Sequence, residues 1–226
     1  MAYCYFKCPF FDGPEELHEV DVELLHKTIV DFKEDSKVAL WGGSRGAELA
    51  TVLATYLERN PLLVSADLYI ADRPAHIVVP AYFSYYDDSS NWKNGQPWVQ
   101  PIKDNWIGTK EGPHILKKGW VWGIDANAFT PYEPIEIEHY TGPYLAIHGA
   151  EDKIWPMQFS MILENRLVKS GNSVESFTYD ENETQSSVNS TNAQFHYFKG
   201  TGHSFASEWS QMLRAEVIKD FLNQHF

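Results

Sequence analysis

The sequence is poor in cysteine. Cys4 and Cys8 are the two cysteines among 226 residues. If the segment that carries them is extended, four residues separate them by roughly 13 Å, which is too far for a disulfide. Two reduced cysteines are typical of a protein from a reducing compartment, so we expect a cytoplasmic location.

The sequence is also short of basic residues and has no long apolar run. Lys and Arg number 18 against 31 Asp and Glu, giving a formal net charge of −13. Because phosphate backbones are bound by clustered cations, we expect no nucleic-acid partner. No apolar run approaches the ~20 residues of a membrane-spanning helix, and no charged-then-apolar leader precedes Tyr3. We therefore expect neither a membrane span nor a signal peptide.

Short apolar runs alternate with helical patterns along the chain. Strands are predicted at 2–6, 38–41, 62–70, 76–80, 144–148, 174–179 and 195–198, and helices at 15–32, 47–57, 156–169 and 207–223. This alternation predicts an α/β fold with a mainly parallel sheet flanked by helices. The length suits one domain over residues 1–226.

Two segments lack a clear period. Residues 84–139 mix Asn, Gly, Pro and Trp, and we interpret them as a lid or pocket-forming insertion. The tract 180–194 is almost entirely polar, which predicts a flexible surface loop.

Ser44 lies in a glycine-rich turn between a predicted strand and a predicted helix. The turn is Gly42-Gly43-Ser44-Arg45-Gly46. A strand, a tight glycine turn and a helix make up the nucleophile elbow of serine hydrolases. The turn therefore indicates that Ser44 is a nucleophile; the alternative is an ordinary glycine turn. It lacks the lysine of a phosphate-binding loop, and no His/Cys cluster has metal-ligand spacing, so we expect no metal and no cofactor.

A serine hydroxyl needs a general base and a group that orients the base. Asp152 follows the predicted strand 144–148, and His203 lies in a later turn of small residues. The order Ser, Asp, His along the chain is that of α/β hydrolases. Glu151 is the alternative acid.

The oxyanion of an acyl-transfer reaction needs two donors. We expect one from the backbone N–H of Arg45, which follows the nucleophile. The second normally comes from a loop after an earlier strand, and its source is open here. His76 and His148 flank apolar runs, and we interpret them as core or pocket residues.

Several motifs together resemble the C-terminal catalytic domain shared by acyl-CoA thioesterases and bile acid-CoA:amino acid N-acyltransferases. They are Ala2-Tyr3, Glu15-Glu-Leu17, Gly42-Gly-Ser-Arg-Gly-Ala-Glu-Leu-Ala50, His76-Ile-Val-Val79, Ser89-Ser-Asn-Trp92, Asn94-Gly-Gln-Pro97, Glu151-Asp-Lys-Ile-Trp-Pro156 and Gly202-His203. The resemblance implies an α/β-hydrolase-like sheet and the triad Ser44, Asp152 and His203. It also places Trp92 and Trp155 as candidate substrate-binding residues.

The same resemblance implies that an acyl-CoA is cleaved by water into a free acid and CoA. Members that conjugate amino acids typically use cysteine as nucleophile, so Ser44 favours hydrolysis. The family's N-terminal β-sandwich and first sheet strands have no counterpart in this sequence, so we expect an N-terminally truncated sheet. Its open edge needs a partner strand, for example from a second copy of the chain. The alternatives are a degenerate, non-catalytic binding module and an amino acid N-acyltransferase.

Overall fold

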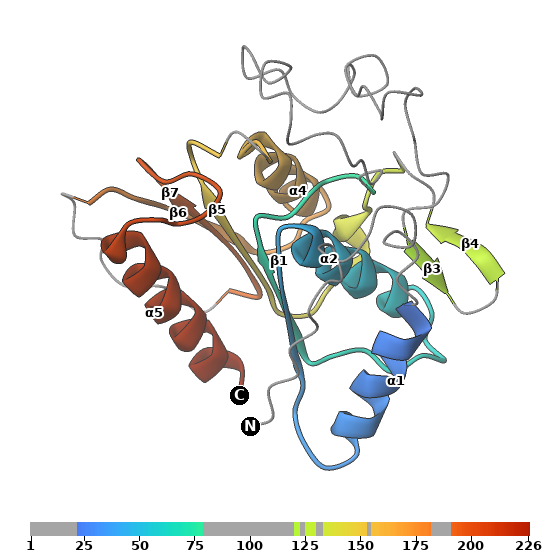
Figure 1. Ribbon diagram of the computed structural model, residues 1–226. Coiled ribbons are helices and arrows are strands. Elements are labelled where there is room, and N and C mark those ends of the chain that lie inside the picture. The colour runs from blue at the N-terminus through green and yellow to red at the C-terminus, as the bar shows by residue number, and fades with distance from the viewer. Residues whose placement is uncertain (1–21, 79–119, 123–124, 130–132, 153–154, 182–190) are drawn as a thin grey trace, which may run out of the picture.

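The computed structural model describes residues 22–78, 120–122, 125–129, 133–152, 155–181 and 191–226 (Figure 1). Its centre is a five-stranded parallel sheet in the order β1-β2-β5-β7-β6. The strands are β1 (Ala39–Gly43), β2 (Leu68–Asp72), β5 (Tyr144–Gly149), β6 (Val174–Tyr179) and β7 (Ala193–Phe198). The predicted parallel α/β architecture is confirmed.

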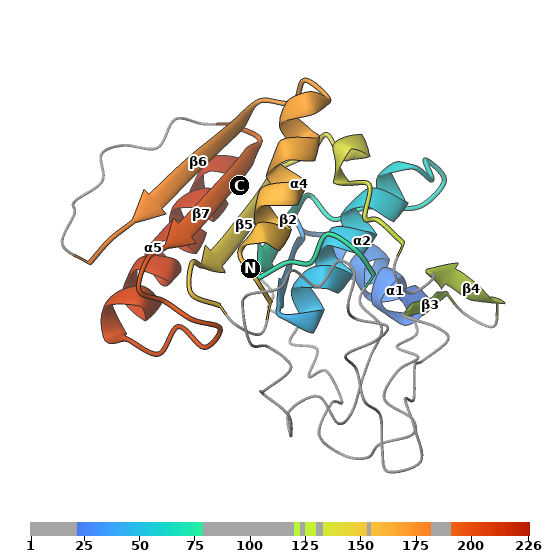
Figure 2. The ribbon, with the colours of Figure 1, turned by 90° about the horizontal axis from the view of Figure 1, so that it is seen from above.

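The helices lie on both faces of this sheet (Figures 1 and 2). They are α1 (Val22–Lys33), α2 (Arg45–Glu58), α4 (Gln158–Lys169) and α5 (Glu208–His225), with a 3-10 turn η3 (Ile137–His139). A separate antiparallel pair is formed by β3 (Trp120–Trp122) and β4 (Asp125–Phe129). None of the described helices combines the length and the apolar character that a membrane crossing requires.

Alternate side chains of the central strands pack into two separate cores. Tyr69 and Ala71 of β2 belong to the cluster that contains α2 and α4. Leu68 and Ile70 belong to the cluster under α5. All residues of β2, β5 and β7 are buried, as expected for strands covered by helices on both faces.

The two outer strands of the described sheet are less covered than the central ones. Strand β1 is half-buried, and its Trp41 is 51% exposed. Strand β6 also alternates between partly buried and exposed residues. The order of the strands therefore leaves β1, which leads into Ser44, at one edge of this sheet.

Two predicted boundaries were wrong. The strand predicted at 62–70 is formed only over 68–72, because Leu62 is 97% exposed and Asp67 uses its carboxylate to accept the N–H of Val38. The polar loop predicted to run to 194 ends earlier, since Ala193 and Gln194 already pair with β5 and β6.

Other predictions lie partly or wholly outside the described residues. The strand at 2–6 and most of the insertion 84–139 are outside them, as are the start of the helix at 15–32 and residues 182–190 of the loop. Of the strand predicted at 76–80, Ile77 forms an isolated antiparallel bridge with Pro134.

The parallel strands end at one edge of the sheet. Gly43 of β1 pairs with Asp72 of β2, and Gly149 of β5 pairs with Phe198 of β7. The residues that follow these strand ends are therefore brought close together, whatever their separation in sequence.

The turn after β1 has no room for a side chain at Gly42. A Cβ at this position would lie 2.0 Å from the carbonyl oxygen of Gly46 and 2.8 Å from the nitrogen of Ala47. Both are backbone atoms and cannot rotate away. A Cβ at Gly46 would meet nothing within 4 Å.

We expect Gly42→Ala to lower the free energy of unfolding by about 1–3 kcal/mol, because the backbone must shift to relieve the overlap. Gly46→Ala, in the first turn of α2, is the matched control, and it should leave stability unchanged or raise it by up to about 1 kcal/mol. Urea unfolding of both variants tests this. Equal losses at the two positions would contradict the expected difference.

Candidate active site

Ser44 occupies a strained turn between β1 and α2. Its φ is 54° and its ψ is −118°, a conformation that residues other than glycine rarely adopt. Its N–H donates to the carbonyl oxygen of Asp72 at 2.8 Å, and its own carbonyl accepts from Ala47 at 2.9 Å and Glu48 at 3.1 Å. Backbone hydrogen bonds on both sides therefore hold the serine at the carboxyl edge of the sheet.

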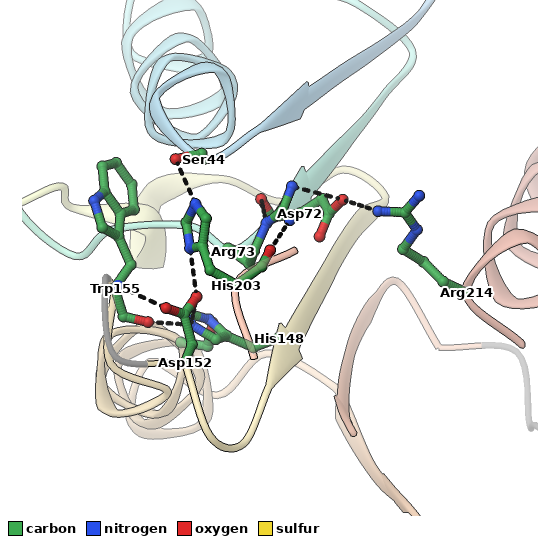
Figure 3. A network of polar contacts seen from close by, with 9 residues as sticks. Ser44, Asp72, Arg73, His148, Asp152, Trp155, His203 and Arg214 are labelled. Carbon is green, nitrogen blue, oxygen red and sulfur yellow. Dashed lines mark hydrogen bonds and ion pairs between the residues drawn. The ribbon is translucent and has the colours of Figure 1, made fainter. Parts of the chain in front are cut away.

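His203 links Ser44 to Asp152. Its Nε2 lies 3.0 Å from the Oγ of Ser44, and its Nδ1 lies 2.7 Å from Oδ2 of Asp152 (Figure 3). When Asp152 is ionised, Nδ1–H donates to it, and Nε2 is left to accept the hydroxyl proton of Ser44. The three residues predicted from the sequence therefore form one continuous chain of hydrogen bonds.

Asp152 lies in the turn after β5 and is buried. Its Oδ1 accepts the backbone N–H of Trp155 at 2.8 Å, and its Oδ2 lies 3.5 Å from Nε2 of His148. Burial alone would raise the pKa of Asp152, but the hydrogen bonds from His148 and His203 outweigh it and hold that pKa well below its usual range. The carboxylate therefore stays ionised beside His203 near neutral pH.

His148 supports the turn that carries Asp152. It is fully buried, with Nδ1 2.6 Å from the Oγ of Ser160 and Nε2 2.6 Å from the carbonyl oxygen of Trp155. A buried imidazole bonded at both nitrogens joins the end of β5, the acid turn and the start of α4. The core position inferred from the sequence is what the structure shows, together with this supporting role.

Trp155 contributes its backbone to this arrangement. Its N–H and carbonyl bond to Asp152 and His148, while its indole is 5% exposed and lies 6.3 Å, centroid to centroid, from the ring of Phe159. Its role in substrate binding stays a prediction. Trp92 lies outside the described residues.

Arg45 is the first residue of α2, so its backbone N–H belongs to the helix N-terminus next to Ser44. Its side chain pairs with Glu48 at 2.5 Å, and both side chains are buried. Within the described residues, the structure assigns no second oxyanion donor. No group of three or more His, Cys, Asp and Glu in this part of the chain is arranged to hold a metal ion.

The sequence reading missed a charged cluster beside the triad. Asp72 ends β2, Arg73 follows it, and Arg214 approaches from α5 (Figure 3). Burial raises the pKa of Asp72, while the two guanidinium groups oppose that rise. An Asp-Arg pair at the end of an otherwise apolar strand was the available signal, because Ser44 and Asp152 also lie just after strand ends.

No family model matches the chain, and no curated protein matches its sequence. Solved structures do match. One is the acylaminoacyl peptidase of Pyrococcus horikoshii, which is 13% identical with a TM-score of 0.50 over 89% of this chain and 26% of that one. The chain has the α/β-hydrolase fold.

Two further structures are similar at lower TM-scores. An esterase of the planctomycete Thermogutta terrifontis is 15% identical, with a TM-score of 0.43, over 83% of this chain and 56% of that one. MGS-M1, an α/β hydrolase from a deep-sea metagenome library of the Medee basin, is 15% identical, with a TM-score of 0.46, over 90% and 62%. The chain thus spans between about a quarter and three fifths of the length of these proteins.

His76 is a buried histidine close to this site. Its ring packs edge-on against Phe159 at 4.7 Å, and its Nδ1 has no hydrogen-bond partner among the residues that the structure describes. Burial, with a smaller contribution from the Arg166 guanidinium, lowers the pKa of His76 to about 4 from 6.5. Between pH 6.5 and about pH 4, His76 therefore binds a proton in the unfolded chain but not in the folded chain.

We expect His76 to destabilise the fold as the pH drops from about 6.5 to about 4, by about 1–3 kcal/mol in total. His76→Leu should flatten the dependence of the unfolding free energy on pH over this interval. Replacement of the exposed His139 by Gln is the control for the loss of a histidine from the surface. An unchanged slope in His76→Leu, measured by urea unfolding at several pH values, would contradict the assignment.

Proposed function

We propose that the protein is a serine hydrolase that forms an acyl-enzyme at Ser44, and that its substrates are acyl thioesters, most specifically acyl-CoA. The observation that carries the proposal is the chain of hydrogen bonds from Ser44 through His203 to Asp152 at the carboxyl edge of the sheet. A buried, ionised carboxylate behind an imidazole that faces a serine hydroxyl is the arrangement that acyl transfer requires.

The proposed reaction follows from these contacts. His203 Nε2 takes the proton of Ser44 as the Oγ attacks the acyl carbon, and Asp152 stabilises the imidazolium through Nδ1–H. The N–H of Arg45 donates to the oxyanion. The leaving thiolate departs and is protonated by His203, and the free acid is then released by water that His203 activates.

The finer assignment to thioesters rests on the family that the sequence motifs resemble. The run from Gly42 to Ala50 and the acid turn from Glu151 to Pro156 are the most specific of those motifs. With serine as nucleophile, the acyl-enzyme is an ester, which an amine intercepts less readily than it does a thioester. This favours water over an amino acid as the acceptor.

Labelling with a fluorophosphonate tests the nucleophile. We expect wild type to be modified at Ser44 and Ser44→Ala to remain unmodified, with the site assigned by peptide mass spectrometry. Asp152→Asn should slow labelling by about 10⁴-fold, because the amide no longer holds the productive imidazole tautomer. Ser170→Ala, a serine at the end of α4, should label at the wild-type rate.

Folded wild type that resists the probe, under conditions that label a control hydrolase, would refute the hydrolase. It would favour the non-catalytic binding module instead.

The substrate class is tested with one acyl group on three leaving groups: CoA, a short neutral thiol and p-nitrophenol. We expect kcat/KM to be highest for the CoA thioester and all three activities to be lost in Ser44→Ala. Equal kcat/KM values for the two thioesters would show that the CoA moiety is not recognised, and the proposal of a thioesterase would still stand. Glycine or taurine that diverts the product into an amide would identify an N-acyltransferase.

A further inference from the structure

Three described residues other than glycine have a positive φ, and all three meet beside the triad. They are Ser44 at 54°, Arg73 at 64° and Phe205 at 48°. Such a conformation is unfavourable for a side chain with a Cβ and persists only where the surroundings impose it. The elbow accounts for Ser44. Arg73 and Phe205 need a separate explanation.

Arg73 lies beside the nucleophile and the base (Figure 3). Its backbone N–H donates to the carbonyl oxygen of Ile147 at 2.6 Å, which continues the pairing of β2 with β5 past the end of β2. The left-handed conformation then turns its side chain toward the loop after β7. There, Nη1 donates to the backbone carbonyl oxygen of His203 (Figure 3).

Asp72 holds the guanidinium of Arg73 in place. Its Oδ2 accepts from Nη2 of Arg73 at 3.2 Å and from Nη1 of Arg214 at 3.0 Å. The carbonyl oxygen of Asp72 also accepts the N–H of Ser44. Asp72 and Arg73, two consecutive residues, therefore bond to the backbone of both Ser44 and His203.

The surroundings of Arg73 are shaped to receive this side chain. Phe205, which is fully buried, has the Arg73 guanidinium 5.5 Å from its ring centroid and the Arg214 guanidinium 5.1 Å from it. Both contacts are within cation–π range. On the other side, a Cβ at Gly43 would lie 3.0 Å from Nη2 of Arg73. The glycine before the nucleophile thus leaves space for the guanidinium.

We propose that Arg73 is a positioning residue, whose guanidinium fixes the His203 carbonyl and so sets the imidazole at bonding distance from the Oγ of Ser44. The inference rests on the proposed function, because it takes the Ser44–His203 pair as the reacting pair. A planar guanidinium presents several N–H donors in a fixed fork, so it reaches the carboxylate of Asp72 and the carbonyl of His203 at once. A lysine ammonium is a compact point charge and does not reach both. A displacement of about 1 Å at the base lowers the rate by up to about 10²-fold.

The test is the rate of Ser44 labelling by a fluorophosphonate, together with kcat and KM for an acyl thioester, in Arg73→Lys and Arg73→Gly. We expect the labelling rate and kcat to fall by about 10–10²-fold with little change in KM, because positioning acts on the reacting geometry. Glycine accepts a φ of 64° without strain, so Arg73→Gly separates the loss of the side chain from a backbone defect.

Arg214→Lys is the matched control. Arg214 contacts the same Asp72 oxygen and the same Phe205 ring as Arg73, but it has no bond to the His203 carbonyl. We expect it to lose thermal stability comparable to that lost in Arg73→Lys, with a much smaller loss of rate. Rate losses that match between the two variants would show a general structural role and overturn the inference.

A second measurement separates this inference from the proposed function. The Nδ1–H of His203 should give a low-field proton resonance that is absent from His203→Gln. We expect this resonance to shift or broaden in Arg73→Gly and to persist in Arg214→Lys. If wild type does not label, the hydrolase is refuted, and the resonance still reports on Arg73. An unchanged resonance in Arg73→Gly, or wild-type labelling in both Arg73 variants, would overturn the positioning role.

Discussion

Parallel pairing of four strands is the constraint on which the rest of the structure depends. Since β1, β2, β5 and β7 run in one direction, the residues after each carboxyl end meet at one edge. Ser44, Arg73, Asp152 and His203 reach the site in this way. No side-chain interaction is strong enough to gather these segments alone, so the backbone ladder supplies the geometry and the side chains refine it.

The site combines strained backbone with buried charge, and each is balanced by the other. Left-handed residues at Ser44, Arg73 and Phe205 are unfavourable in isolation. The carboxylates of Asp72 and Asp152 are unfavourable when removed from water. Arg73, one of the strained residues, donates to Asp72, and His203 donates to Asp152.

The sequence predicted the parts of the site that depend on local order. Ser44, Asp152 and His203 each follow an apolar run, so position along the chain indicated them, and the family resemblance favoured Asp152 over the adjacent Glu151. The irregular course of 62–67 was missed because apolar residues such as Leu62 can also be left in water. The function of Arg73 was missed for another reason: it depends on a carbonyl oxygen 130 residues away and on α5. Such contacts carry no periodic signal.

The position of Arg214 on α5 has a consequence for the order in which the protein is made. Because synthesis runs from the N-terminus to the C-terminus, Ser44 and its elbow are made before His203, in the loop after β7, and before Arg214, one of the two arginines that pair with Asp72. A nascent chain therefore has the serine long before it has the imidazole. The hydrogen bond between Ser44 and His203 therefore cannot form until the loop after β7 has been made.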